Sequence, residues 1–468
     1  MLFNSLHFLI FLPVFILLYY LVAFKYRWIL IFIASCYFYM AFVPTYILIL
    51  FLIIGIDFVS GIAIENSKNQ KRKLFLILSL LSNILLLCFF KYFNFLNENI
   101  SGILNLFGQQ FHPINLDIIL PIGLSFHTFQ SMSYTIEVYK GHQKAERHLG
   151  YFANYVLYFP QMVAGPIERY DRLGTELKQE HKPVYQNFSD GFKLILFGLF
   201  VKMTIADNLA PYVNQIYADP LKYSPSQVFT GLILFSFQIY ADFYGYSTIA
   251  LGSARLMGIR LMDNFKTPYL SKSVSEFWSR WHISLSTWFR DYLYIPLGGN
   301  RGNLLRWSIN ILIVFMVSGL WHGASWTFVI WGALHGVNLL AERFFNKVFN
   351  FKIKETWSLL NLLLLLKTFL VTTLIWVFFR AESFSKAKDV FQALTRTTNI
   401  SDISLESVLP GIMCVLLVLS DLWVYNSRID DRLQTYKPVY RWAIYTVLIF
   451  CLFALAGTQK FAFIYFQF

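Results

Sequence analysis

Long apolar stretches recur along the whole chain, and they constrain the fold more than any other feature. A stretch of about 20 apolar residues matches the roughly 30 Å hydrocarbon thickness of a bilayer. The sequence is 57% hydrophobic and 14% charged, whereas soluble domains are about 45–50% apolar and about 25% charged. This excess is too large for one buried core, because a soluble core stops growing with chain length. The sequence therefore predicts an all-α polytopic membrane protein.

The apolar stretches predict about eleven to twelve membrane crossings. The expected spans are Leu6–Phe24, Trp28–Val43, Pro44–Ile64, Leu74–Phe90, Ile118–Glu137, Phe192–Ala210, Gln227–Leu251, Trp307–Trp321, Ser325–Glu342, Trp357–Phe379, Ser407–Trp423 and Tyr440–Leu455. A further segment, Tyr151–Pro166, contains two prolines and a glycine, which is typical of a broken or re-entrant segment buried in protein. The first span lacks the basic flank and cleavage site of a signal peptide, so we expect it to remain uncleaved.

The Lys and Arg residues lie in short loops between the spans. Almost all of these loops fall on one side if the N-terminus is outside, and the positive-inside rule makes that side cytoplasmic. With twelve spans the C-terminus is outside as well, and the loop Arg380–Glu406 is the exception to the charge pattern. The net charge of +13 thus forms no continuous basic face for nucleic acid. The four cysteines have no metal-ligand or redox spacing, so we expect no metal site.

The stretch Arg255–Arg306 is weakly apolar and differs from an ordinary loop. It carries seven Lys and Arg residues up to Arg301. It is also rich in aromatic residues, namely Phe277, Trp278, Trp281, Trp288, Phe289, Tyr292 and Tyr294. Aromatic residues interleaved with cations predict an amphipathic layer that lies in the membrane interface.

His322 lies between two apolar runs, in a segment that reads Ser318-Gly-Leu-Trp-His-Gly-Ala-Ser-Trp326. The two glycines allow close approach of another backbone, and the two tryptophans are expected to form rigid walls. A neutral imidazole in such a pocket can act as a general base near neutral pH. A buried histidine bonded to a carbonyl group explains the residue equally well, so the residues alone leave both roles open. For His335, further along the same apolar region, we expect a packing role.

His282 follows the aromatic run that begins at Phe277. On a continuous helix, Trp278, His282 and Leu285 share one face and Arg280 points away from it. The Arg290–Asp291 pair beyond them is typical of scaffolding.

Asp242 and Tyr246 place a carboxylate four residues before a phenol inside an expected span. An ionisable group within a span costs on the order of 2.5–3.5 kcal/mol on insertion scales, so each is a functional candidate. Asp242 can orient a buried partner or a histidine, and a hydrogen-bonded structural role fits equally well. No zinc, Walker, nucleophile-elbow or dinucleotide signature occurs. The residues predict a membrane-embedded histidine site and leave the reaction open, with a transporter or flippase as an alternative to an enzyme.

A set of motifs runs in order through nearly the whole chain. They are Met1–Ser5, Leu120–Gln130, Phe159–Arg169, Asp242–Ser247, Phe277–Leu285, Arg280–Arg301, Trp321–Gly323 and Trp376–Arg380. Together they resemble the membrane-bound O-acyltransferase (MBOAT) family, in the bacterial branch typified by the membrane subunits of alginate and peptidoglycan O-acetylation.

This resemblance implies a single integral-membrane domain over residues 1–468. It implies a ring of about 11–12 transmembrane helices, with re-entrant or interfacial helices, around a central funnel or tunnel. By the same resemblance His322 is the catalytic histidine and His282 is the second signature position. The implied tunnel-lining candidates are Asp242, Tyr246, Trp278, Trp281, Trp321, His127, Gln130 and Arg290. The donor implied is acetyl-CoA or another acyl thioester, with no bound cofactor, and the location implied is the bacterial cytoplasmic membrane.

The aromatic segment 460–468 has two interpretations. It can be an anchor in the headgroup layer, where Tyr and Phe are expected. It also resembles the Phe-x-Tyr-Phe-x-Phe tail of cell-envelope acylation systems, which implies that Tyr465 carries the acyl group after accepting it with help from His322. The implied partners are an extracytoplasmic SGNH-hydrolase-like acetyltransferase and a polysaccharide acceptor, such as alginate or peptidoglycan. D-alanyl transfer to teichoic acid is the alternative enzymatic activity.

Overall fold

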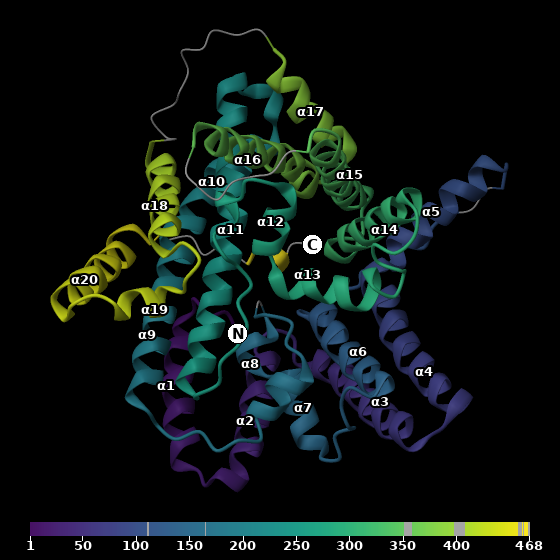
Figure 1. Ribbon diagram of the computed structural model, residues 1–468, viewed down its shortest axis with the longest axis vertical. Helices are drawn as coiled ribbons and strands as arrows, with labels where there is room; N and C mark the ends of the chain where they lie inside the picture. The colour runs from purple at the N-terminus through teal and green to yellow at the C-terminus, as the bar shows by residue number, and fades with distance from the viewer. Residues whose placement is uncertain are drawn as a thin grey trace. The chain divides into compact units, whose positions relative to one another are not determined.

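The computed structural model describes residues 1–109, 112–163, 165–350, 358–396, 408–456, 461 and 463–466. All regular structure in these ranges is helical (Figure 1). The chain forms two compact units. Unit 1 comprises Met1–Gly191 and Ala250–Met262, and unit 2 comprises Phe192–Ile249 and Asp263–Phe468. The chain passes from one unit to the other within α9 (Tyr185–Leu199) and within α11 (Pro225–Leu256).

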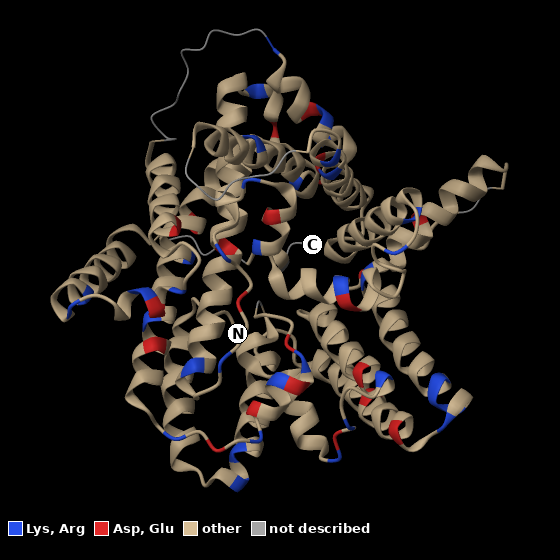
Figure 2. Cartoon of the chain, viewed as in Figure 1, with Lys and Arg blue, Asp and Glu red and all other residues tan. Residues whose placement is uncertain are grey.

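Unit 1 contains the helices of the N-terminal part. They are α1 (Leu6–Leu21), α2 (Phe24–Met40), η1 (Pro44–Tyr46), α3 (Ile47–Asn66), α4 (Asn69–Leu87), η2 (Cys88–Tyr92), α5 (Phe93–Leu106), α6 (Leu124–Lys140), α7 (Leu149–Leu157), α8 (Phe159–Met162) and η3 (Tyr170–Gly174). In Figure 2, α1 is tan along its whole length, while Lys and Arg gather at the start of α4, just after its turn from α3. This is the alternation of apolar helices and basic loops that the sequence predicts.

The core of unit 1 contains a buried carboxylate. Asp57 of α3 accepts hydrogen bonds from Ser79 Oγ at 2.6 Å, Asn83 Nδ2 at 2.8 Å and Ser131 Oγ at 2.5 Å. These donors lie on α4 and α6, so one side chain joins three helices. A buried polar group is tolerated when its hydrogen bonds are satisfied, which explains a carboxylate at this depth.

The expected broken segment Tyr151–Pro166 is confirmed in the residues that the structure describes. The helix α7 ends at Leu157, and the four-residue helix α8 follows at once. Both are too short to cross a bilayer, which needs about 20 helical residues. Ala164 of this segment lies outside the described residues.

Unit 2 contains the remaining helices. They are η4 (Phe200–Ala206), α10 (Asp207–Ala218), η5 (Pro220–Lys222), most of α11, η6 (Pro268–Leu270), α12 (Val274–Arg280), α13 (Ile283–Phe289), η7 (Arg290–Tyr294), α14 (Leu304–His322), α15 (Trp326–Val348), α16 (Leu359–Arg380), α17 (Phe384–Leu394), α18 (Val408–Val424), α19 (Ile429–Gln434), α20 (Pro438–Leu455) and η9 (Ile464–Phe466). The helices α14 and α15 form an antiparallel pair, and α15 packs on α16.

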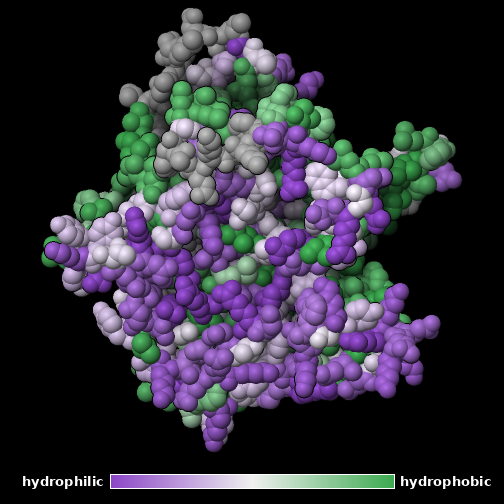
Figure 3. Space-filling view, viewed as in Figure 1, coloured by the Kyte–Doolittle hydropathy of each residue, from purple (hydrophilic) through white to green (hydrophobic). Residues whose placement is uncertain are grey.

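Seven described helices are long and apolar enough to cross a membrane, and two shorter apolar helices accompany them. The seven are Pro44–Asn66, Asn69–Leu106, Tyr185–Ala218, Pro225–Leu256, Leu304–His322, Leu359–Arg380 and Pro438–Leu455. The expected spans that fall on α2, α6 and α15 are helical but lie outside this set. No residue of α20 is buried, and Figure 3 shows hydrophobic side chains gathered over α18. Apolar surface of this extent is typical of contact with lipid.

The stretch Arg255–Arg306 contains no helix that could cross a bilayer. Its described helices beyond the end of α11 are η6, α12, α13 and η7, each of seven residues or fewer, and α14 begins only at Leu304. Short helices fit the expected layer of interfacial segments, whose place in the membrane stays a prediction.

Two glycines let the backbones of α14 and α15 touch. A Cβ atom on Gly319 would lie 2.1 Å from the carbonyl oxygen of Phe328, and a Cβ on Gly332 would lie 2.1 Å from that of Phe315. Real Cβ atoms do not approach an oxygen so closely, so the helix pair depends on hydrogen at both positions. The predicted close approach at Gly319 is therefore confirmed.

We expect Gly319→Ala to destabilise the protein by about 1–3 kcal/mol, the usual cost of overpacking. The matched control is Gly411→Ala in α18, where no atom lies within 4 Å of the new Cβ. That control should be neutral or slightly stabilising, because alanine has the better helix propensity. Thermal unfolding in detergent micelles measures the difference, and equal midpoints for the two variants would contradict the packing argument.

Candidate functional site

His322 is the last residue of α14, and it is buried among aromatic rings of unit 2. The centroid of its ring lies 5.1 Å from that of Trp331, 5.3 Å from Phe379 and 4.9 Å from Trp321. Trp331 lies on α15 and Phe379 on α16, so three helices form the walls. The expected wall from Trp321 is confirmed, whereas that from Trp326 is wrong: its side chain is 51% exposed at the start of α15, and Trp331 takes its place.

His282 lies beside His322, with their ring centroids 6.4 Å apart. Its side chain is fully buried and its ring also packs on Phe243 of α11 at 4.7 Å. Burial lowers the pKa of His282 to about 3, so its imidazole is neutral at physiological pH. A neutral imidazole offers one N–H donor and one acceptor nitrogen.

The backbone at His282 contradicts the helical face predicted for Trp278, His282 and Leu285. The helix α12 ends at Arg280, and α13 starts at Ile283. His282 joins them in the left-handed conformation, with φ of +44°. This conformation is uncommon for a residue with a Cβ atom and marks a locally strained site. The break turns the His282 side chain toward His322 instead of along a helix face.

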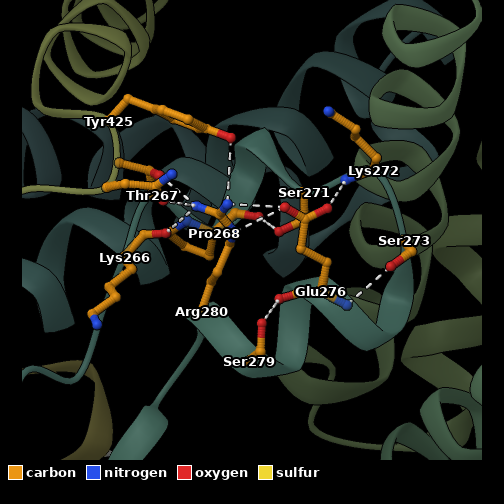
Figure 4. A network of polar contacts seen from close by, with 11 residues as sticks. Lys266, Thr267, Pro268, Ser271, Lys272, Ser273, Glu276, Ser279, Arg280 and Tyr425 are labelled. Atoms are coloured by element: carbon orange, nitrogen blue, oxygen red, sulfur yellow. Dashed lines mark hydrogen bonds and ion pairs between the residues drawn. The ribbon is translucent and has the colours of Figure 1, made fainter. Parts of the chain in front are cut away.

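Arg280 fixes the end of α12, as Figure 4 shows. Its guanidinium pairs with Glu276 at 2.9 Å and donates to the carbonyl oxygen of Lys266 at 3.1 Å and to Asn426 Oδ1 at 2.9 Å. It also lies 5.3 Å from the centroid of the Tyr425 ring. These contacts tie the residues just before His282 to two other segments of unit 2. Arg280 is therefore an anchor for the break that places His282.

The described part of the C-terminal segment lies in the same group of rings. The ring centroid of Tyr465 is 5.5 Å from that of His322, 4.8 Å from Phe243 and 6.2 Å from Phe379. Its neighbour Phe463 packs on Tyr246 at 4.7 Å. Four residues of the expected tail motif, Lys460, Ala462, Gln467 and Phe468, lie outside the described residues. The structure thus brings together His322, His282 and Tyr465, which are far apart in sequence.

Asp242 lies next to this group but does not orient a histidine. Its Oδ2 accepts a hydrogen bond from the Ile464 amide at 2.8 Å, and its Oδ1 lies 2.7 Å from Lys202 Nζ. Three roles were considered for Asp242, and these contacts fit both a carboxylate that orients a buried partner and one with a hydrogen-bonded structural role.

A model of the membrane-bound O-acyltransferase family matches residues 16–381, which is most of the chain. The chain belongs to the membrane-bound O-acyltransferase family. The match includes His282 and His322 and stops before Tyr465. The predicted family is confirmed, and the chain is a multi-pass membrane protein.

Curated relatives of this acyltransferase come from several bacteria. The probable alginate O-acetylase AlgI of Pseudomonas aeruginosa is 38% identical over 450 residues, which cover 94% of this chain and 84% of the relative. The peptidoglycan O-acetyltransferase of Helicobacter pylori is 35% identical over 363 residues, covering 72% and 67%. The teichoic acid D-alanyltransferase of Bacillus subtilis is 30% identical over 255 residues, covering 51% and 62%. The predicted enzyme class, an acyltransferase of the O-acetyltransferase type, is confirmed, and the transporter alternative is set aside.

A cavity of about 400 Å³ lies between α12, α13, α14 and α15 of the acyltransferase. Its apolar lining includes Trp278, Phe315 and Leu339, and its cationic lining is Arg290 and Arg343. Ser318 also lines it, one helical turn before His322 on α14. Arg290 pairs with Asp291 at 2.8 Å and remains largely exposed, so it combines the expected scaffolding contact with a place at the cavity.

The remaining aromatic candidates of unit 2 support the wall around His322. Trp281 is buried and packs on Trp376 with ring centroids 5.1 Å apart, and Trp376 packs on Trp331 at 5.5 Å. His335 is buried against Trp278 at 5.0 Å and Trp331 at 5.1 Å. The packing role expected for His335 is confirmed by these contacts.

His127 and Gln130 belong to unit 1, where they bind the backbone of α7. The ring Nδ1 of His127 lies 2.8 Å from the carbonyl oxygen of Val156, and Gln130 Nε2 donates to the carbonyl oxygen of Tyr155. Both contacts fasten α6 to the broken segment. This structural role accounts for two of the candidates that the motifs had suggested for the tunnel.

Four residues at the site were missed by sequence reasoning: Phe243, Trp331, Phe379 and Lys202. Lys202 carried a usable signal, because a lysine inside an expected span is costly unless it has a partner. Asp207, five residues later, supplies one such partner at 2.7 Å. Phe243 and Phe379 lie inside two of the motifs, Asp242–Ser247 and Trp376–Arg380. Trp331 carried no signal, since the expected spans hold other tryptophans.

Proposed function

We propose that this enzyme moves an acetyl group from a cytoplasmic thioester donor, acetyl-CoA, across the membrane for O-acetylation of a cell-envelope or exported polysaccharide. His322 acts as the general base, and Tyr465 carries the acetyl group covalently. The observation that carries this proposal is the 5.5 Å separation of the His322 and Tyr465 rings inside a buried aromatic pocket. The relatives support the acetyl group, since they are named for O-acetylation of alginate and peptidoglycan.

The proposed transfer has two balanced steps. In the first, the His322 imidazole takes the phenol proton of Tyr465, and the phenolate oxygen attacks the thioester carbonyl carbon. The carbon–sulfur bond breaks, and the imidazolium returns the proton to the departing thiolate, which leaves as CoA. In the second, an acceptor hydroxyl displaces the tyrosine oxygen from the acetyl group, and the phenol regains a proton. An aryl ester suits this relay because covalent catalysis needs an intermediate that reacts onward.

His282 and the cavity support the donor side of the reaction. A neutral His282 beside His322 can donate a hydrogen bond to the thioester oxygen as negative charge develops there. The cavity at Ser318 has room for an apolar arm, and Arg290 and Arg343 offer cations suited to phosphate groups. We propose that the donor enters by this route, along Trp278.

The wider arrangement is part of the same proposal. The whole chain works as one integral-membrane domain, a ring of about eleven or twelve transmembrane helices around a funnel, in the bacterial cytoplasmic membrane. Both termini face outward, so that the segment with Tyr465 can meet an extracytoplasmic SGNH-hydrolase-like acetyltransferase. Trp281, Trp321 and Tyr246 shape the pocket wall, and His127 and Gln130 brace the broken segment.

Donor competition tests the proposed activity. The purified protein is reconstituted in vesicles with radiolabelled acetyl-CoA or with a D-alanyl thioester on its carrier protein, and free thiol and protein-bound label are measured. We expect thiol release and label from acetyl-CoA only. Label from the D-alanyl donor alone would favour the teichoic acid activity for which the Bacillus subtilis relative is named. No turnover with either thioester would contradict the proposal.

A further inference from the structure

A buried ionic triad lies under the C-terminal segment of unit 2. Lys202 Nζ lies 2.7 Å from Asp207 Oδ1 and 2.7 Å from Asp242 Oδ1, and the three side chains are 1%, 6% and 4% exposed. Lys202 lies on η4, Asp207 at the start of α10 and Asp242 on α11. Two carboxylates share one ammonium group, so Lys202 can balance the charge of only one ionised carboxylate. A buried charge in this state requires further hydrogen bonds.

The C-terminal segment supplies contacts to both ends of the Lys202–Asp242 pair. The Ile464 amide donates to Asp242 Oδ2 at 2.8 Å, and Lys202 Nζ donates to the carbonyl oxygen of Phe461 at 3.5 Å. Both contacts involve the backbone of the segment. They therefore fix its register along the pocket without depending on which side chains it carries.

This register determines where Tyr465 lies. Tyr465 follows Ile464 directly, and its ring packs on Phe243, which follows Asp242 directly. The adjacent residues Asp242 and Phe243 of α11 thus contact the amide of Ile464 and the ring of Tyr465, respectively. Phe243 also contacts His282, and Tyr465 contacts His322, so the docked segment lies against both histidines.

We propose that Asp242 and Lys202 form a clamp that docks the C-terminal segment and positions the Tyr465 hydroxyl for acyl transfer at His322. This inference rests on the carrier role proposed above for Tyr465. The two clamp residues are positioning residues, because they act through the tail backbone and contact neither the thioester nor the reacting oxygen. The amide of Ile464 in turn compensates part of the buried negative charge, so the clamp and the docked tail stabilise each other.

The competing explanation is that the triad only joins η4, α10 and α11. Two substitutions separate these explanations. Asp242→Asn removes the clamp charge and leaves Lys202 neutralised by Asp207, so the fold keeps a balanced pair. Asp207→Asn removes the same charge from the same lysine, and no hydrogen bond joins Asp207 to a described residue of the C-terminal segment. A purely structural triad predicts similar effects for both variants.

Hydrogen–deuterium exchange of the peptide that contains residues 463–465 measures whether the C-terminal segment is docked, independently of enzymatic activity. In the full-length reconstituted protein we expect Asp242→Asn to speed exchange of this peptide at least about tenfold, as expected for loss of a local contact. Asp207→Asn should speed it much less. The rate of Tyr465 acetylation should fall about a hundredfold in Asp242→Asn, with an unchanged KM for acetyl-CoA, because a displacement near 1 Å costs about this factor.

A second variant leaves the triad untouched. Ile464 is the first residue of η9, a position that accepts proline. Ile464→Pro therefore removes the donated N–H together with the isoleucine side chain. Ile464→Ala keeps the N–H and is its matched control. Slower acetylation in the proline variant than in the alanine variant supports the clamp. The clamp is overturned if the 463–465 peptide exchanges equally fast in Asp242→Asn and Asp207→Asn and if the two Ile464 variants are acetylated at equal rates. Absence of an adduct in the parent protein, with exchange still faster in Asp242→Asn, overturns the carrier role instead.

Discussion

Replacing His322 by Gln is expected to lower acetyl transfer by about two to four orders of magnitude, the usual contribution of a general base. Glutamine is close to histidine in size and can occupy the pocket between Trp331 and Phe379, so the loss should come from the missing base. Transfer is measured as CoA release from acetyl-CoA by reconstituted protein, alongside thermal unfolding. Retention of more than about a tenth of the parent rate would remove His322 from the proposed base role.

His335→Phe is the matched control for this experiment. His335 is buried in the same aromatic cluster, parallel to Phe277 within 4° and with ring centroids 6.2 Å apart. Neither of its ring nitrogens has a hydrogen-bond partner among the described residues, so a phenyl ring can replace it without losing a polar contact. We expect this variant to keep most of the activity, which separates loss of a base from loss of a buried histidine.

Tyr465→Phe is expected to abolish covalent acetylation of the protein and to reduce transfer to an acceptor to background. The substitution retains the ring packing on Phe243 and Phe463, and the lost hydroxyl has no hydrogen-bond partner among the described residues. The fold and the docking of the tail should therefore persist. Intact-protein mass spectrometry after incubation with isotopically labelled acetyl-CoA measures the adduct.

The chemistry of the adduct provides a further check on Tyr465. An aryl ester at this residue should map to the C-terminal peptide and be released by hydroxylamine, whereas an amide on a lysine should resist. Undiminished transfer to the acceptor in Tyr465→Phe would show that the acetyl group passes directly from the donor. In that outcome the segment would be an aromatic anchor beside the site.

The sequence predicted the long helices and the broken segment well, because hydropathy and proline content are local properties. It also predicted a histidine pocket, since Gly319 and Trp321 flank His322 in a manner that permits close packing. The helical face proposed for His282 was wrong for a physical reason. A face of this kind assumes one continuous helix, and the stretch Trp278–Leu285 contains no glycine or proline to signal the left-handed break at His282.

The long-range assembly of the site was only partly predictable. The link between Tyr465 and His322 came from a resemblance, because no local pattern indicates that a segment folds back into a pocket. The triad of Lys202, Asp207 and Asp242 was within reach of sequence reasoning, since charged residues in apolar segments require partners. Which partner each residue takes depends on the packing of η4 against α11, and spacing in the sequence does not determine that packing.

The direct contact of the α14 and α15 backbones at Gly319 and Gly332 has a consequence for inhibition. The side of the pocket that carries His322 belongs to two helices in backbone contact, whereas the opposite side is a short segment held by ring contacts of Phe463 and Tyr465 and by the Ile464 amide. A ligand that competes with this segment need not deform any helix. A short extended peptide with a free amide and a phenylalanine in place of the tyrosine would occupy the same position and offer no oxygen for acetylation. We expect such a peptide to inhibit the proposed transfer.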